Sequence, residues 1–131
     1  RVRFLGALDS VEQVYQAADC LVHPTLEDTF AMVVLEAMSY GLPVVVSSER
    51  YCGIAGLLTD GLNALILKEP KNTAALTKQI NRVIDDASLR EKLSAEALRF
   101  ASGYAWAHIA REQSLVYEIA CGKNFKSQFK V

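Results

Sequence analysis

The residues best suited to chemistry lie in one short stretch, residues 23–43, which reads HPTLEDTFAMVVLEAMSYGLP. Its polar opening carries Asp28. After seven intervening residues comes Glu36, the single charged residue between Phe30 and Ser48. A carboxylate on an otherwise apolar helix is costly to bury unless a hydrogen-bond donor meets it. We therefore predict that Glu36 is kept for a ligand, with an arginine from a neighbouring element as the alternative partner.

A helix that begins near Thr29 would make this stretch a nucleotide-binding site. Its first backbone N–H groups, Phe30 to Val33, have no acceptor inside the helix and, with the helix dipole, suit a diphosphate. Glu36 lies one turn above Met32 and leans back toward the helix start, where it could accept both hydroxyls of a ribose. Asp28 could accept hydroxyls of a sugar beyond the phosphates. The alternative is that Asp28 or Thr29 simply caps the helix.

Other reactive residue types give no second site. His23 fits a satisfied strand-end histidine better than a general base, and His108 fits an inert position on an exposed helix face. The motifs HExxH, GxGxxG and GxxxxGK[ST] are absent, which disfavours zinc, dinucleotide and P-loop chemistry. The cysteines form no CxxC pair and no metal-ligand cluster with either histidine: Cys20, Cys52 and Cys121. A zinc site of these residues therefore has little support.

Length and composition fit one compact domain. The chain has 131 residues, of which 51% are hydrophobic, and a net charge of −1, which gives no electrostatic footprint for nucleic acid. No apolar run reaches the roughly 18 residues of a membrane span, and no signal peptide is visible. We expect a cytoplasmic location. Because the chain starts with Arg1 and at once with a strand pattern, we also expect a fragment of a longer protein.

The last ten residues differ in character from the rest. Residues 122–131 carry Lys123, Lys126 and Lys130 beside two phenylalanines and no acid. Such a basic and aromatic tail could rest on anionic lipid at the inner face of a membrane. The alternatives are a frayed terminus or packing against a domain outside this chain.

Hydrophobic periodicity predicts alternating strands and helices. Strands are expected at 1–5, 20–23, 44–46 and 64–67. Helices are expected at 10–18, with Asp9 or Ser10 as its cap, at 31–40, which ends at Gly41, at 73–86 and at 105–121. A further helix is expected to begin at a cap formed by Ser88. A helical turn is expected at 54–58, and Met32 and Met38 are expected in the core. Apolar strands that alternate with helices predict an α/β fold, a doubly wound parallel sheet covered on both faces. In such sheets ligands bind beyond the carboxyl ends of the strands, here loops 6–9, 24–30, 48–56 and 68–71.

These residues also carry a resemblance to a known family. Residues 28–31 (DTFA), 35–38 (LEAM) and 41–44 (GLPV) resemble the signature of the C-terminal donor domain of GT-B fold, family 4 (retaining) glycosyltransferases. The similarity continues at residues 4–6, 17–19, 60–63 and 104–106, so it covers nearly the whole chain. His23-Pro24 and Cys52-Gly53 are similar to the lipopolysaccharide core glucosyltransferases.

The resemblance implies a function for each part of the site. Residues 1–121 would be a Rossmann-like, nucleotide-sugar-binding domain without its first strands and helices, the C-terminal half of a GT-B fold. Glu36 would hold the ribose and Asp28 the donor sugar, as the catalytic pair. The backbone that meets the diphosphate and the sugar would be that of Thr29, Phe30, Ala31, Met32 and Val33.

The resemblance also implies a reaction. The donor would be a UDP- or GDP-linked hexose, transferred with retention and without a metal or other cofactor. The acceptor would be a glycan or a lipid-linked molecule, bound by an N-terminal domain that this chain lacks, so the fragment alone would be inactive.

Three departures from the family pattern keep an alternative open. Asp28 stands where glutamate is usual, Thr29 and Ala31 where glycine is common, and Leu8 where many relatives have an arginine near the diphosphate. Asp28 and Leu8 favour the alternative of a non-catalytic module that binds nucleotide sugars. The spacing of Asp28 and Glu36 disfavours an epimerase or a phosphorylase of the same fold, and an accidental motif in a soluble α/β domain is the last alternative.

Overall fold

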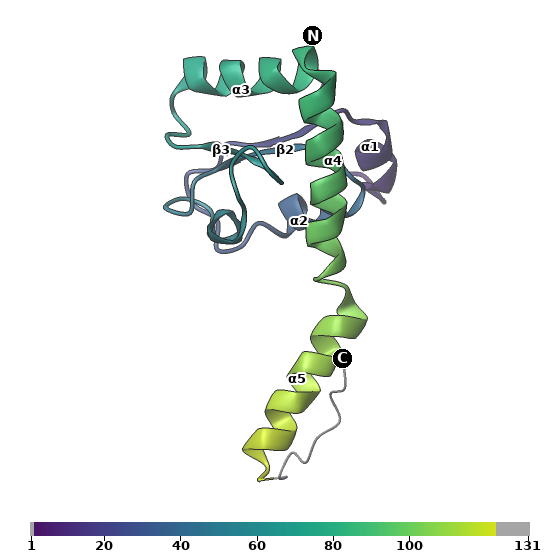
Figure 1. Ribbon diagram of the computed structural model, residues 1–131. Coiled ribbons are helices and arrows are strands. Elements are labelled where there is room, and N and C mark those ends of the chain that lie inside the picture. Colours follow the sequence, from purple (N-terminus) through teal and green to yellow (C-terminus); the bar gives the residue numbers. More distant parts are fainter. Residues whose placement is uncertain (1, 123–131) are drawn as a thin grey trace. The chain divides into compact units, whose positions relative to one another are not determined.

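A computed structural model describes residues 2–122 of the chain (Figure 1). Its helices are α1 (Glu12–Ala17), α2 (Met32–Ser39), α3 (Thr73–Asp85), α4 (Ala87–Ser102) and α5 (Trp106–Ala120), with a 3-10 helix η1 (Gly53–Leu57). Its strands are β1 (Leu21–His23), β2 (Val44–Ser47) and β3 (Leu65–Leu67). The predicted elements from residue 10 onward are therefore confirmed in type and order.

The three strands form one parallel sheet in the order β1-β2-β3. Leu21 is paired with Val44, and Val45 is paired with Leu65. Since parallel neighbours need a crossover, α2 connects β1 to β2, and η1 lies in the connection from β2 to β3. The predicted α/β class with a parallel sheet is confirmed.

Alternate residues of the strands pack into two separate core layers, as the two-residue repeat of a strand requires. On one face, Val44 and Val46 pack with Met38 of α2. On the other face, Val45 packs with Val83 of α3 and with Leu93 of α4. Figure 1 accordingly shows α2 and α3 on opposite sides of the sheet. Because both faces are covered, β2 is an unbroken buried run and not an alternating one.

Local capping residues set the ends of the helices. Gly41 has a φ of +74° and follows the last turn of α2, a left-handed position that glycine adopts without steric cost. The side chain of Asn72 accepts from the amide of Ala75 and begins α3. The predicted cap of α4, Ser88, was wrong by two residues. Asp86 accepts from the amide of Leu89 instead, because the carboxylate just before the first turn reaches that N–H.

The predicted strand at residues 1–5 was wrong. Residues 2–5 have no regular structure, and the ring of Phe4 is 97% exposed. A strand needs a neighbour that accepts its backbone hydrogen bonds, and none of the described strands pairs with this segment. At the start of α1, Ser10 accepts from the amide of Glu12, while Val11 occupies the cap position.

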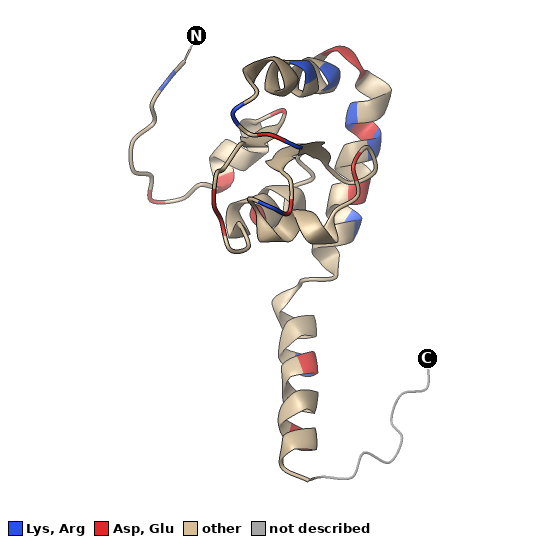
Figure 2. Cartoon of the chain, turned by 90° about the vertical axis from the view of Figure 1, so that its left-hand side faces the viewer, with Lys and Arg blue, Asp and Glu red and all other residues tan. Residues whose placement is uncertain are grey.

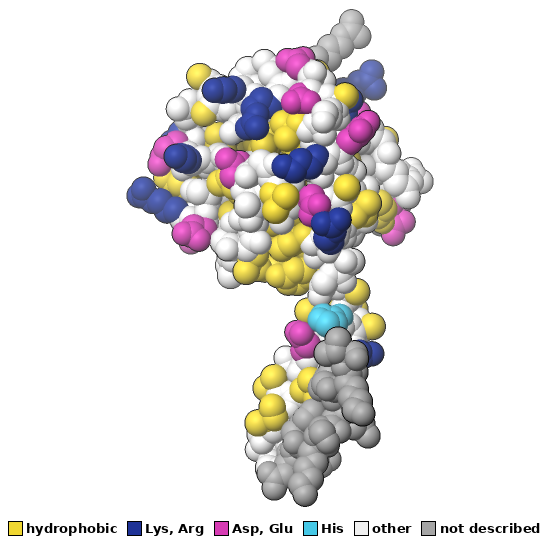
Figure 3. Space-filling model, viewed as in Figure 1, with side chains coloured by type: hydrophobic (Ala, Val, Ile, Leu, Met, Phe, Trp, Pro, Cys, Tyr) yellow, Lys and Arg dark blue, Asp and Glu magenta, His cyan; other side chains and the backbone are white. Residues whose placement is uncertain are grey.

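The described chain divides into two compact units, with the boundary between Ala101 and Ser102. Acidic and basic side chains are interspersed over the first unit (Figures 2 and 3). Within the second unit, α5 buries none of its residues, and Trp106 remains 81% exposed. None of the described helices is long and apolar enough to cross a membrane. The predicted domain limits, 1–121 and 122–131, stay a prediction, and the expected lipid contact falls on residues 123–131, outside the described residues.

Candidate functional site

The loop that carries Asp28 is held by hydrogen bonds of its backbone to the end of β2 and to the loop that follows β2. The amide of Asp28 donates to the carbonyl oxygen of Tyr51 at 2.9 Å, and the amide of Gly53 donates to the carbonyl oxygen of Asp28 at 3.1 Å. The buried hydroxyl of Ser47, the last residue of β2, donates to the carbonyl oxygen of Thr25 at 2.7 Å. The loop therefore has a defined position at the carboxyl edge of the sheet.

Both carboxylate oxygens of Asp28 have partners inside the protein. Oδ1 accepts from the amides of Phe30 at 3.1 Å and Ala31 at 2.6 Å. Oδ2 lies 3.2 Å from Nε2 of His23. Asp28 thus holds the loop just before α2, whereas the cap position of the helix is Ala31, which has no side-chain cap. The alternative that Asp28 or Thr29 caps the helix was therefore wrong, and His23 is a satisfied strand-end histidine. The side chain of Asp28 remains partly exposed and can still accept from a ligand.

The hydrogen bonds to Asp28 correct the expected row of four free amides. The amides of Phe30 and Ala31 already donate to Asp28, because the loop turns back on itself just before α2. Among the described residues, the amides of Met32 and Val33 have no acceptor. The anion site offered by the start of α2 is therefore narrower than predicted and is formed by two N–H groups.

Ala31 adopts a left-handed backbone conformation, with φ 63° and ψ 67°. Among the described residues it is the one non-glycine with a positive φ. Such a conformation costs a residue with a Cβ on the order of 1–2 kcal/mol. Glycine adopts this left-handed conformation without that cost. This explains why glycine is common at this position in the family pattern.

Glu36 is exposed, although its neighbours along the sequence are apolar. It lies on the outer side of α2, so its carboxylate has no large desolvation cost to offset. Its Oε2 accepts from the hydroxyl of Tyr15 at 3.0 Å. The predicted alternative of an arginine partner was wrong, since no basic side chain of the described residues pairs with Glu36.

Tyr15 is the buried end of this hydrogen bond. Its ring is 8% exposed and lies 5.4 Å from the ring of Tyr40, at an interplanar angle of 31°. Burial, followed by the hydrogen bond to Glu36, raises the pKa of Tyr15 to about 12. Tyr15 is therefore a protonated donor throughout the physiological range.

The two methionines behave differently. Met38 is fully buried, as predicted, but Met32 is 49% exposed. The prediction for Met32 was wrong because it stands at the first position of α2, where the helix start faces solvent at the edge of the sheet. Its side chain is thus available beside the free amides.

The cysteines are free thiols in the structure. Burial raises the pKa of Cys20 to about 11. Burial, and then the nearby charge of Asp28, raises the pKa of Cys52. A thiol with a raised pKa is protonated at neutral pH and is a poor nucleophile. Neither thiol fits a catalytic role.

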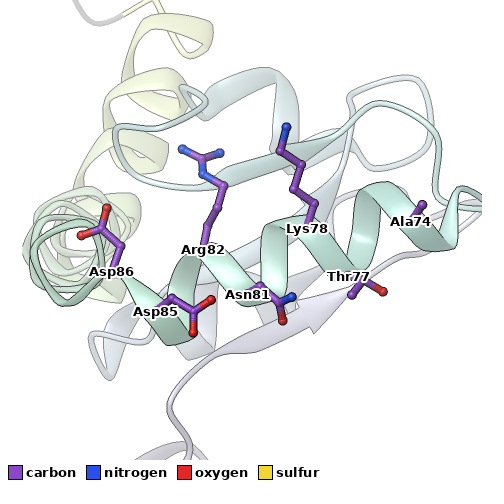
Figure 4. A pocket seen from close by; sticks show the side chains of 7 residues that line it. All are labelled: Ala74, Thr77, Lys78, Asn81, Arg82, Asp85 and Asp86. Atoms are coloured by element: carbon purple, nitrogen blue, oxygen red, sulfur yellow. The ribbon is translucent and has the colours of Figure 1, made fainter.

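Two cavities lie outside the predicted set of site residues. One of about 320 Å³ lies at the carboxyl ends of β2 and β3 and is lined in part by Ser48, Asp60 and Lys68. The other, of about 540 Å³, runs along α3, with Lys78 and Arg82 among the side chains shown in Figure 4. The lining of the second cavity mixes both charges and comes from α3 and the residue that follows it, so it resembles an ordinary solvated surface.

Sequence reasoning missed three residues that shape the site: Tyr15, Ser47 and Gly53. Tyr15 lies within the predicted helix 10–18, and its partner is 21 residues away. Ser47 directly follows the predicted strand 44–46, and its hydroxyl is fully buried. Gly53 gave a usable signal, since a glycine directly after a buried strand and loop can mark a close approach of two backbones.

The fold and the site together define a class of protein. The parallel α/β sheet, with the predicted site residues at its carboxyl edge, matches the C-terminal, Rossmann-like domain of GT-B glycosyltransferases. The chain belongs to the family glycosyl transferases group 1, whose model matches residues 1–100.

Individual relatives agree with this assignment. An uncharacterised glycosyltransferase of Methanocaldococcus jannaschii is 35% identical over 123 residues, which are 92% of this chain and 31% of that protein. Anabaena Alr3699/HepE, solved in complex with UDP, is 25% identical with a TM-score of 0.78, over 92% of this chain and 32% of that one. WaaG, a glycosyltransferase involved in lipopolysaccharide biosynthesis, is 27% identical with a TM-score of 0.64, over 72% and 25% of the two chains. The chain thus spans about a third or less of the length of these relatives.

Proposed function

We propose that this chain is the donor-binding domain of a retaining, family 4 glycosyltransferase and that it binds a UDP-linked or GDP-linked hexose. The observation that carries the proposal is the position of Glu36. It is an exposed carboxylate one turn beyond the two free amides of Met32 and Val33, on the helix that starts at the carboxyl edge of the sheet. A diol on Glu36 and a diphosphate on the amides are then one turn apart, which fits the reach of a nucleotide diphosphate.

In this proposal each residue has a stated task. Glu36 accepts the ribose hydroxyls, and the backbone of Thr29 to Val33 lines the diphosphate and the sugar. The helix start stabilises the charge that develops on the leaving diphosphate, and positioning supplies much of the remaining rate enhancement. Asp28 accepts a hydroxyl of the donor sugar with the lone pairs that the amides of Phe30 and Ala31 and the ring of His23 leave free.

The whole enzyme would transfer the hexose to a glycan or lipid-linked acceptor in the cytoplasm, with the acceptor bound outside this chain. UDP is supported as the nucleotide by the complexes of Alr3699/HepE with UDP, UDP-glucose, and UDP with glucose. The similarity to WaaG supports a role in lipopolysaccharide synthesis. The proposal includes retention of configuration and independence from metal, both taken from the resemblance of the motif.

Calorimetric titration of the full-length protein with UDP tests the central assignment. Glu36→Ala should weaken UDP binding by about 1–3 kcal/mol, the usual cost of removing a charged hydrogen-bond partner. Glu27→Ala is the matched control, because Glu27 is a nearby exposed acid whose side chain takes no part in the proposed site. Equal affinities of wild type and Glu36→Ala would refute the assignment. Titration after treatment with EDTA should give the same affinity as before if no metal is required.

A second candidate is a module that binds the nucleotide sugar without transferring it. It is favoured by the commitment of both Asp28 oxygens to partners within the protein. Incubation of the full-length protein with UDP-glucose separates the two candidates. Release of UDP in the presence of acceptor extract or water favours the transferase, and its absence, with binding intact, favours the module.

A further inference from the structure

We infer that Tyr15 is a positioning residue for the nucleotide: its hydroxyl holds one oxygen of Glu36 and so presents the rest of the carboxylate to a vicinal diol. The inference rests on the proposed function and adds a residue from a different helix, α1, to the site on α2.

The hydrogen bond between Tyr15 and Glu36 fixes one side of the Glu36 carboxylate and leaves the other side free. The Tyr15 hydroxyl donates to Oε2 of Glu36 at 3.0 Å, and the Glu36 residue is exposed. A carboxylate has about four acceptor positions, so one donor on Oε2 leaves Oε1 and one lone pair of Oε2 for two further hydroxyls. A vicinal diol donates two hydrogen bonds side by side, which matches what remains.

Tyr15 is itself held in place from two directions. Its ring is buried in the core layer that contains Ala37 and Met38 of α2. The ring of Tyr40, just beyond the end of α2, lies against it at 5.4 Å. A buried phenol has few rotamers available, so its hydroxyl is a fixed point. An exposed glutamate, by contrast, has three flexible side-chain torsions and would lose that freedom when it binds. Because the hydrogen bond to Tyr15 already orders the Glu36 side chain, less conformational entropy is lost when the ligand binds.

The direction of the hydrogen bond also suits a ligand that donates. Tyr15 is the donor and Glu36 the acceptor, so the contact leaves the remaining acceptor positions of the carboxylate to a ligand. A basic partner would instead neutralise Glu36 and compete with the diol for both oxygens. The hydroxyl therefore orients Glu36 without occupying it.

The test compares UDP with 2′,3′-dideoxy-UDP, which lacks the diol, on the full-length protein. Tyr15→Phe should weaken UDP binding about threefold to tenfold, the effect of one hydrogen bond, and leave 2′,3′-dideoxy-UDP unchanged. Tyr40→Phe is the matched control: it keeps the ring contact, removes the neighbouring hydroxyl, and should leave both affinities unchanged. In a turnover assay, Tyr15→Phe should raise the KM for the donor with little change in kcat.

The outcomes separate this inference from the proposed function. An equal loss for both nucleotides in Tyr15→Phe would mean a structural role and overturn the inference. Tyr15→Phe could leave the affinity for UDP unchanged while Glu36→Gln lowers the affinity for UDP but not for 2′,3′-dideoxy-UDP. That result would overturn the inference and leave the proposed function standing. If the wild type and Glu36→Gln each bind UDP and 2′,3′-dideoxy-UDP with the same affinity, the proposed role of Glu36 itself is refuted. If Tyr15→Phe melts well below wild type, the double variant with Glu36→Gln decides, because coupled residues give a combined loss smaller than the product of the single losses.

Discussion

A Cβ atom added to Gly53 would overlap the carbonyl oxygen of Thr29. The two backbones can approach this closely only because Gly53 has no side chain. The contact brings the first residue of η1 against the loop before α2, beside the pair of hydrogen bonds that Asp28 makes with Tyr51 and Gly53. A glycine thus sets the distance between the two loops at the carboxyl edge of the sheet.

Gly53→Ala should lower the free energy of unfolding by at least about 2 kcal/mol, because the atom in the way is backbone and cannot rotate aside. Urea denaturation of the full-length protein measures the change. Gly56→Ala, in the same 3-10 helix, is the control, since its Cβ would meet only the flexible end of Glu49, with Oε2 at 3.2 Å. Similar losses in the two variants would contradict the close approach at Gly53.

Ala31→Gly should change the free energy of unfolding by less than about 1 kcal/mol. Relief of the left-handed conformation gains on the order of 1–2 kcal/mol, while glycine entropy costs about 0.5–1 and the lost buried methyl about 0.8. These terms nearly cancel. Ala31→Val should instead cost about 2–3 kcal/mol, because a β-branched residue tolerates a positive φ poorly and the site is 4% exposed. The same denaturation experiment measures both, and a harmless valine would argue against the left-handed backbone.

Asp28 combines a structural task with a proposed one, and two substitutions distinguish them. Asp28→Ala removes the acceptor of the loop amides of Phe30 and Ala31 and should cost about 1–2 kcal/mol of stability. Asp28→Asn keeps an oxygen that can accept from the same amides, so it should be nearly neutral for stability. If Asp28 also holds the donor sugar, Asp28→Asn should reduce the advantage of UDP-glucose over UDP in calorimetry. An asparagine variant as unstable as the alanine variant would show that the negative charge, and not the two hydrogen bonds, stabilises the loop.

Stability should fall in alkaline solution because the half-buried thiol of Cys20 and the buried hydroxyl of Tyr15 hold their protons more tightly in the folded state. The Cys20 thiol ionises near 9.0 when unfolded, whereas burial raises its folded pKa to about 11. Between these pH values the unfolded chain binds fewer protons, so the free energy of unfolding decreases as the pH rises. Tyr15 adds a second decline between 10.0 and about 12.

Urea midpoints measured from pH 8 to pH 11 test this expectation. Cys20→Ala should start from a lower stability, owing to the lost side chain, but show a shallower fall between pH 9 and pH 11. Parallel curves for wild type and Cys20→Ala would mean that the thiol is no harder to ionise in the folded protein.

Much of the fold follows from short windows of the sequence. The three apolar runs that became β1, β2 and β3 and the glycine that ends α2 are each recognisable within a few residues, because strand burial and helix ends depend on local patterns. The motif around Asp28 and Glu36 is equally local, and it sufficed to indicate the family. Residues 2–5 have an equally good strand pattern but no strand, since pairing depends on a neighbour and not on the pattern itself.

The tertiary structure alone decided how the site residues are used. The sequence predicted a ligand, or else an arginine, as the partner of Glu36. The fold leaves Glu36 exposed and places the hydroxyl of Tyr15, a residue 21 positions earlier, within hydrogen-bond distance. In the folded structure, two of the four amides predicted to be free donate to Asp28, and the side chain of Met32 is exposed to solvent. The physical reason is that side-chain exposure and hydrogen-bond partners depend on which elements meet in space. Periodicity along the chain determines only which face each element turns toward the core.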